Sequence, residues 1–270
     1  SKPVRGFQEI AFLSEDEIDL AEAALLIAAI EYPNLEPATY LKELDNFAAR
    51  AGELLTPSAA PLEKIDAING VLFRELGFCG NRENYYDPRN SFLNEVIDRR
   101  TGIPITLSVV YIEVARRASL PLAGVGMPAH FLVKHSDDAF IDPFNAGRVL
   151  SPSDSAGLLA QMSGGNIDFQ PQYLSAVPKK QILTRMLANL QGIYTRGADY
   201  GRALRVLDHS LILNPDSQSH IRDRARLLFA LGRRADALRE LERCLALPGN
   251  DQDSITREIN SIRRDQARMN

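Results

Sequence analysis

The fold is decided by residues 101–145, TGIPITLSVVYIEVARRASLPLAGVGMPAHFLVKHSDDAFIDPFN. Residues 104–118 are apolar on nearly all sides, which is typical of a helix at the centre of a domain. Pro104 suits the first turn of that helix, because a proline there loses no hydrogen bond. The runs AGVGMPAHFLVKH and AFIDPF predict strands around a turn at SDD. They carry His130 and Asp142, and an aspartate can fix the tautomer of a histidine that acts as a base.

This layout resembles the catalytic core of transglutaminases and papain-type enzymes. In such a core, a cysteine at the helix start is activated by a histidine, because a helix N-terminus and an imidazole together favour the thiolate. When the Gly-x-Cys…Arg-x-x-Gly spacing of transglutaminase-like proteins is laid on Gly102, Arg116 and Ser119, the nucleophile's place falls on Pro104. The resemblance implies an α+β fold with a transglutaminase/papain-like core, whose usual covalent chemistry lacks its nucleophile.

The patterning divides the chain into four segments. Ser14 predicts an N-cap for a helix over EDEIDLAEAALLIAAIEY, and Pro37 and Pro61 each predict the start of a further helix. GFCGNRENYYDPRNSF predicts a loop, and FLNEVIDRRTG predicts a short helix that ends at Gly102. Residues 151–180 contain Ser, Gly, Pro and Gln and predict a connector. We expect a helical lead-in over 1–76, the core over 77–160, a connector over 161–180 and repeat-like helices over 181–270.

An internal repeat follows the connector. Ala203-Leu204 recurs as Ala237-Leu238, Leu207 recurs as Leu241, and Pro215 is echoed at Pro248. This period is near the 34 residues of the tetratricopeptide unit, a helix–turn–helix. Stacked helix pairs of this kind commonly hold a peptide or a partner helix in a groove. A purely structural cap on the core is the alternative.

The combination of these motifs resembles the bacterial SirB-one family, in which a transglutaminase-like domain is fused to tetratricopeptide repeats. The residues that carry the resemblance are YYDPRNSFLNEVIDRRTGIPITLSVVYIEVARR, PAHFLVKH, IDPFNAG and SHIRDRARLLFALGRRADALRELE, within about residues 8–250. The family has a proline where transglutaminases have cysteine. The resemblance therefore implies that Pro104 is a regular feature of such proteins.

Two interpretations of the His130–Asp142 pair stay open. It is either a working base or a structural hydrogen bond in a retired active site, and the missing nucleophile favours the second. Cys79 is the alternative nucleophile, although a lone cysteine is usually an inert apolar side chain. Thr106 and Ser108 are expected to bond the backbone of their helix. Ser91 is expected to cap the helix that follows it.

The segment YYDPRNS is the candidate ligand-binding surface. Tyr85, Tyr86, Asp87, Asn90 and Ser91 offer aromatic faces and hydrogen-bonding groups beside the expected cleft. A well-bonded turn explains the same residues equally well.

The composition narrows the function classes. We expect no metal, because His130 and His135 are five residues apart on one strand, and no cofactor, because no glycine-rich loop matches a nucleotide fingerprint. No apolar run approaches a membrane span, the start lacks signal-peptide order, and Cys79 and Cys244 form no pair, so we expect a cytoplasmic protein. Residues 181–270 hold fifteen Arg, no Lys and eleven acids, a net +4, against −8 elsewhere. Because the arginines alternate with acids, we expect ion pairs and not nucleic-acid binding.

Overall fold

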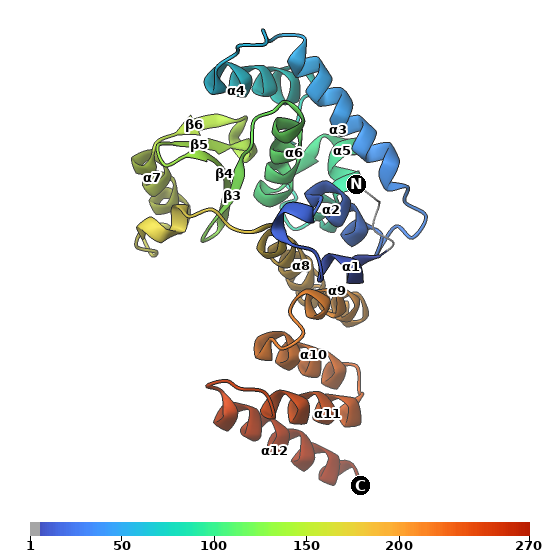
Figure 1. Ribbon diagram of the computed structural model, residues 1–270. Helices are drawn as coiled ribbons and strands as arrows, with labels where there is room; N and C mark the ends of the chain where they lie inside the picture. The colour runs from blue at the N-terminus through green and yellow to red at the C-terminus, as the bar shows by residue number, and fades with distance from the viewer. Residues whose placement is uncertain (1–5) are drawn as a thin grey trace. The chain divides into compact units, whose positions relative to one another are not determined.

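The computed structural model describes residues 6–270, and the first five residues of the expected lead-in lie outside this range. The chain forms two compact units, one over Leu13–Met186 and the other over the residues up to Phe12 together with Leu187–Asn270. Figure 1 shows a mixed helix-and-sheet unit and an all-helical unit. No helix among residues 6–270 is long and apolar enough to cross a membrane.

The lead-in is helical, as predicted. Its elements are α1 (Phe7–Ile10), η1 (Glu15–Glu17), α2 (Leu20–Ala28), α3 (Pro37–Gly52), α4 (Pro61–Asn69) and the π-helical η2 (Gly70–Glu75). Pro37 and Pro61 occupy first helical positions, which confirms both predicted starts. The prediction for Ser14 is wrong in part: it caps η1, and Asp19 caps α2 by accepting from the Glu22 N–H. An aspartate side chain nearer to the apolar run provides the better cap.

The central helix α6 (Pro104–Arg117) begins at Pro104 and buries every residue from 104 to 115. It contacts strand β4 and the turn η4, and also α3, α4 and α5, so it lies at the centre of its unit. The preceding segment forms four short elements, β1 (Cys79–Gly80), η3 (Pro88–Ser91), α5 (Leu93–Arg99) and β2 (Thr101–Gly102). Contrary to prediction, α5 ends before Gly102, because Arg100 adopts the left-handed conformation and Gly102 pairs with Gly80.

The sheet has four antiparallel strands in the order β3-β4-β5-β6. They are β3 (Ala123–Met127), β4 (His130–Ser136), β5 (Ala139–Asp142) and β6 (Arg148–Leu150), with the 3₁₀ turn η4 (Pro143–Asn145) before β6. The run AGVGMPAHFLVKH is a hairpin and not a single strand, since Met127 pairs with His130 across a turn in which Ala129 has a positive φ of 62°. Strand β6 was not predicted.

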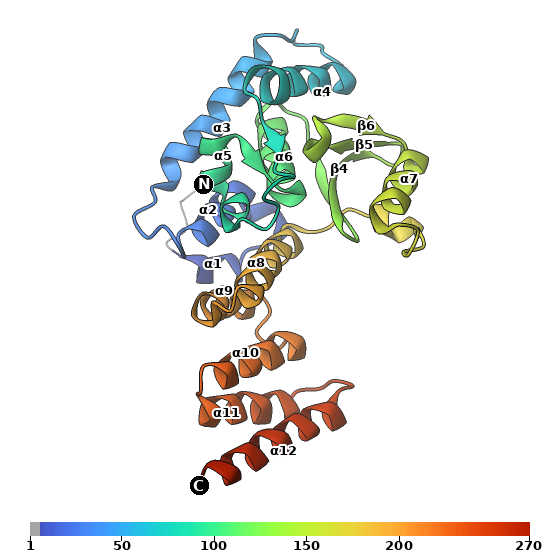
Figure 2. The same cartoon turned by 180° about the vertical axis from the view of Figure 1, so that it is seen from behind.

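The expected connector contains two ordered elements, α7 (Pro152–Ser163) and η5 (Pro171–Leu174). Ser151 and Asp154 form a capping box that starts α7, and α7 contacts β5 and β6. One sheet face carries Val125, Met127, Leu132, Phe140 and Leu150, and it packs against Leu174, Leu158, Phe169 and Tyr173. Residues 152–174 are therefore part of the core. Figure 1 shows α7 beside the sheet, and Figure 2 shows the same arrangement from behind.

The C-terminal region consists of five helices. They are α8 (Lys179–Arg196), α9 (Tyr200–Leu213), α10 (Gln218–Ala230), α11 (Arg234–Leu245) and α12 (Gln252–Met269). Helix α8 spans the boundary between the units at Met186. The repeated positions Ala203, Ala237, Leu207 and Leu241 are all buried, which is what equivalent positions in a repeat require. Gly232, with a φ of 79°, makes the turn between α10 and α11.

Candidate functional site

The predicted pair of His130 and Asp142 is in contact. His130 begins β4 and Asp142 ends the neighbouring strand β5, so both lie at the same end of the sheet. The His130 Nε2 atom is 3.0 Å from the Asp142 Oδ1 atom, and the two side chains are only 1% and 2% exposed. When Nε2 carries the hydrogen it donates to the carboxylate, and the imidazole is held in one orientation.

Two further residues, Asn145 and Arg82, extend the hydrogen bonding of this pair. The sequence did not predict either of them as part of the site. Asn145 Nδ2 donates to the second carboxylate oxygen of Asp142 at 2.6 Å, and Arg82 donates to Asn145 Oδ1. Both oxygens of Asp142 are therefore hydrogen-bonded, which a buried carboxylate needs. The available signal was the position of Asn145, which follows Asp142 by three residues in the turn DPFN.

The other ring nitrogen of His130, Nδ1, is buried and has no hydrogen-bond partner among residues 6–270. With the hydrogen on Nε2, the lone pair of Nδ1 is the only part of the ring that can accept a proton. In this tautomer the ring can act as a base through Nδ1. Its burial means that a substrate could reach Nδ1 only after the protein opens around it.

The start of α6 is fixed by hydrogen bonds around Pro104. Thr106 Oγ1 donates to the Asn90 carbonyl oxygen at 2.7 Å and accepts from the Ile103 N–H at 3.2 Å. The prediction that Thr106 bonds the backbone is confirmed. Ser108 differs, because its buried Oγ has no partner within the described part of the chain. Pro104 itself is buried and offers no nucleophilic atom.

Cys79 lies in β1, where its side chain is exposed. Its Sγ atom is 3.9 Å from Thr101 Oγ1 on the paired strand. The next residue, Gly80, faces Phe144, since a Cβ atom there would lie 2.3 Å from the ring. Successive side chains of a strand point in opposite directions, so the Cys79 thiol points away from Phe144. No bond between Cys79 and His130 is found within residues 6–270.

The segment 85–91 is divided between an exposed part and a structural part. Tyr86 is 62% exposed and Tyr85 36% exposed. Asn90 is buried: its Nδ2 donates to the carbonyl oxygens of Asn84 and Tyr85, and its Oδ1 accepts from Asn81. Asn90 therefore supports the loop and is not available to a ligand in this conformation.

Asp87 and Ser91 complete this segment. The Asp87 side chain accepts from the Arg89 N–H as the N-cap of η3 and pairs with the Arg89 guanidinium, which holds the pKa of Asp87 below its usual value. The prediction that Ser91 caps α5 is wrong, because Phe92 occupies the N-cap position. The buried Ser91 Oγ has no partner among the described residues.

Phe144 connects Tyr85 to the His130–Asp142 pair. Its ring centroid lies 6.0 Å from that of His130 and 6.2 Å from that of Tyr85, both edge to face. The Arg82 guanidinium lies 4.7 Å from the centroid of the same ring. The structure thus brings one of the predicted ligand-binding tyrosines to the histidine through an aromatic contact.

A metal centre has no support in the described residues. Among residues 6–270, no three His, Cys, Asp or Glu side chains are grouped so that they could hold a metal ion. His135 lies on β4 five residues after His130, at a point where the pairing of β4 with β5 shifts register between Lys134 and Ser136.

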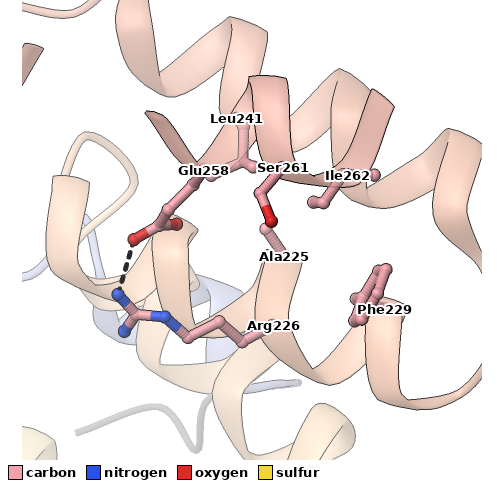
Figure 3. A pocket seen from close by; sticks show the side chains of 7 residues that line it. All are labelled: Ala225, Arg226, Phe229, Leu241, Glu258, Ser261 and Ile262. Carbon is pink, nitrogen blue, oxygen red and sulfur yellow. Dashed lines mark hydrogen bonds and ion pairs between the residues drawn. The ribbon is translucent and has the colours of Figure 1, made fainter. Parts of the chain in front are cut away.

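The helical repeats carry a separate pocket of about 260 Å³. It lies between α10 and α12 and is lined by Ala225, Arg226, Phe229, Leu241, Glu258, Ser261 and Ile262. Figure 3 shows Arg226 and Glu258 at one side, joined by an ion pair of 2.8 Å, and the apolar side chains Phe229 and Ile262 at the other. A pocket with an apolar wall and a charged rim suits a side chain of a bound segment.

Comparison with known proteins agrees with this division of the chain. The profile described as the transglutaminase-like superfamily matches residues 38–188, and a tetratricopeptide-repeat profile matches residues 190–264. A UPF0162 protein of Xylella fastidiosa is 39% identical over 248 residues, which cover 89% of this chain and 88% of the relative. A UPF0162 protein of Pseudomonas aeruginosa is 32% identical over 90% of each chain.

A region of a much longer protein is also similar. F-box only protein 21 of Homo sapiens is 32% identical over 203 residues, which cover 69% of this chain and 31% of that protein. No solved structure matches the chain. The extent of these matches shows that the chain belongs to the transglutaminase-like superfamily and, within it, to the UPF0162 proteins.

Proposed function

We propose that this protein is a non-catalytic member of its superfamily that binds protein or peptide partners, and that Pro104 stands where the nucleophile of an active member would stand. The observation that carries the proposal is the identity of the residue that begins α6. Pro104 is the first residue of the buried central helix and has no group that can form a covalent intermediate. Cys79, the alternative nucleophile, is exposed and points away from Phe144.

The burial of the His130–Asp142 pair supports the same proposal. Both carboxylate oxygens of Asp142 are engaged, and the imidazole is 1% exposed. A buried pair that is well bonded on the Asp142 side can serve as a structural hydrogen bond between β4 and β5 without any turnover.

The tetratricopeptide region supplies the partner-binding part of the proposal. Repeats of this type are commonly interaction surfaces, and the pocket between α10 and α12 offers Phe229 and Ile262 to an apolar side chain. We place the protein in the cytoplasm, which agrees with its two free cysteines, Cys79 and Cys244. Membership of the SirB-one family is part of this proposal.

One observation supports a second function: the Nδ1 atom of His130 has no hydrogen-bond partner among residues 6–270. A buried imidazole that is oriented by Asp142 and has a free nitrogen is arranged as a general base. The alternative function is therefore a hydrolase or acyl transferase that uses this pair with another nucleophile, or with a water molecule activated by His130.

Turnover measurements separate the two functions. The full chain is incubated with glutamine-containing acyl-donor peptides, a general peptide library and activated esters. The variants are His130→Ala, Cys79→Ala and, as a matched control, His135→Ala, which removes the second histidine of β4. We expect no turnover above about 10³-fold over water, the residual help that oriented groups give without a nucleophile.

Larger turnover that His130→Ala abolishes and His135→Ala preserves would overturn the proposal in favour of the hydrolase. If Cys79→Ala also abolished it, Cys79 would be the nucleophile.

A further inference from the structure

Arg185 is a guanidinium held against the end of the sheet that carries His130. It lies on the part of α8 that belongs to the same unit as the sheet. Its Nη2 atom donates to the carbonyl oxygens of Met127 at 2.7 Å and His130 at 3.1 Å, and its Cζ lies 5.5 Å from the Phe131 ring centroid. Its position is therefore fixed by the β3–β4 hairpin.

The positive charge of Arg185 has no carboxylate partner among residues 6–270. Nine other arginines between residues 187 and 270 do pair with acids, namely Arg202, Arg222, Arg224, Arg226, Arg233, Arg234, Arg239, Arg243 and Arg263. Burial lowers the pKa of the Arg185 guanidinium from its usual value, which reflects a charge removed from water. A charge that is partly removed from water and has no counter-ion gains from binding an anion.

Arg185 also has hydrogen-bond donors to spare. Its Nη2 atom makes the two bonds to the hairpin, whereas Nε and Nη1 have no acceptor within the described residues and neither is fully buried. Gly126 allows the guanidinium to pack against its backbone, since a Cβ atom there would lie 2.7 Å from Nη1. A larger residue at position 126 would therefore displace the guanidinium.

The surroundings of Arg185 favour a negative ligand. Tyr85 contacts Phe144, Phe144 contacts His130, and the His130 carbonyl oxygen accepts from Arg185. Burial raises the pKa of Tyr85, and the Arg185 charge opposes this rise. Arg82 lies over the Phe144 ring and likewise has no ion pair among the described residues. The acid of this cluster, Asp142, is already bonded to His130 and Asn145.

We propose that Arg185 is the anchor of a carboxylate-binding subsite beside His130, in which Nε and Nη1 donate to a carboxylate of a bound peptide and Tyr85 forms an aromatic wall. This inference rests on the proposed function and names a chemical group that a bound partner would place beside His130. Hydrogen bonds between a guanidinium and a carboxylate are charge-assisted, and they are stronger than bonds between neutral groups.

The test is a titration of the full chain followed by ¹⁵N NMR of the arginine Nε–Hε signals. The signal that is missing in Arg185→Gln assigns Arg185. The probes are Gly-Gly-Gly with a free carboxylate, the same peptide as its C-terminal amide, and inorganic phosphate. We expect the free acid to shift the Arg185 signal saturably and to bind about 10-fold or more tightly than the amide. Phosphate is expected to bind less tightly than the free acid.

The matched control is Arg148→Gln, which removes the same charge from the exposed face of β6 in the same sheet. It should bind the free acid as the wild type does, whereas Arg185→Gln should lose at least about 10-fold. If Arg185→Gln fails to fold, Arg185→Lys keeps the charge, and we expect it to give a folded spectrum with weaker binding, because its ammonium replaces the planar guanidinium.

Four results would overturn the subsite: equal binding of the acid and the amide, no shift of the Arg185 signal, tighter binding of phosphate than of the acid, or equal losses in Arg185→Gln and Arg148→Gln. The titration measures binding and does not depend on turnover. A negative titration would rule out the subsite but would leave the turnover test of the proposed function unaffected. Turnover that overturned the proposed function would likewise leave the titration unaffected.

Discussion

The two units of this protein differ in whether charged side chains are buried in the core. In the unit over Leu13–Met186, three ionisable side chains are buried in the core: Glu113, His130 and Asp142 are each 1% exposed. In the helical repeats the ion pairs are partly exposed, as in the pair of Arg243 with Glu240, whose side chains are 48% and 18% exposed. The first unit therefore has ionisable groups in its interior, whereas those of the repeats pair at helix surfaces.

This difference predicts where substitutions are costly. A buried charge that loses its partner is left in a medium that solvates it poorly, whereas a surface charge regains water. Removal of one buried partner should therefore destabilise the first unit by more than removal of a surface partner destabilises the repeats.

The largest effect is expected for Glu113→Gln. The Glu113 carboxylate pairs with Arg116 at 2.8 Å and with Arg117 at 2.7 Å while its side chain is 2% exposed. Loss of this charge should lower the free energy of unfolding by about 3 kcal/mol. Hydrogen exchange of the α6 amides measures it. Asp45→Asn, which removes the exposed second partner of Arg117, is the control and should cost less than about 1 kcal/mol. Equal effects of the two variants would remove the contrast between buried and exposed pairs.

A smaller effect is expected for Gly80→Ala. The added Cβ would lie 2.3 Å from the Phe144 ring, so the ring must move and its contact with His130 must change. Overpacking of this kind costs about 1–3 kcal/mol, which urea unfolding can measure. Gly157→Ala adds the same methyl group to α7, where nothing lies within 4 Å, and should stabilise the protein by up to about 1 kcal/mol. A neutral Gly80→Ala would mean that Phe144 is not packed against β1 in solution.

In the repeats, Arg222→Gln should cost more than Arg243→Gln. Arg222 is 13% exposed, donates to Ser254 and pairs with Glu258, so it joins α10 to α12. We expect a loss of about 1–2 kcal/mol for Arg222→Gln. Arg243→Gln should change stability by no more than about 0.5 kcal/mol, because it breaks a surface pair within one helix. Hydrogen exchange of the α10 and α12 amides measures the change in stability of both variants. A larger loss in Arg243→Gln would show that exposure does not rank these pairs.

The sequence predicted elements that local signals define. Pro37, Pro61 and Pro104 each begin a helix, as their fixed φ angle favours. It could not predict elements that depend on distant contacts. Strand β6 exists because Arg148–Leu150 pairs with β5. Helix α7 is stabilised by contact with β5 and β6, although its sequence begins with Pro, Ser and Asp and contains a glycine. The sequence did not predict the hairpin between β3 and β4, because Ala129 in its turn adopts a conformation that alanine rarely takes.

The same limit applied to the site: residues close in the sequence could be predicted, and residues brought in by distant contacts could not. His130 and Asp142 could be paired because they lie on adjacent strand-like runs with a short turn between them. Arg185 could not be placed there, since it is 55 residues beyond His130 and its contact depends on the packing of α8 against the hairpin. The signal in the sequence was a single arginine within the apolar stretch ILTRML, where a charge is unusual.

The measurement that tests the central proposal most directly is the thiol pKa of Pro104→Cys, in a Cys79→Ser background. If the start of α6 is the nucleophile's place beside His130, the introduced thiol should titrate at least one unit below the usual value of about 8.5, and His130→Ala should remove that shift. Cys244 does not interfere, because it is buried and burial raises its pKa. Alkylation by iodoacetamide against pH gives the value. A thiol that titrates at about 8.5 or above, with or without His130, would contradict the account.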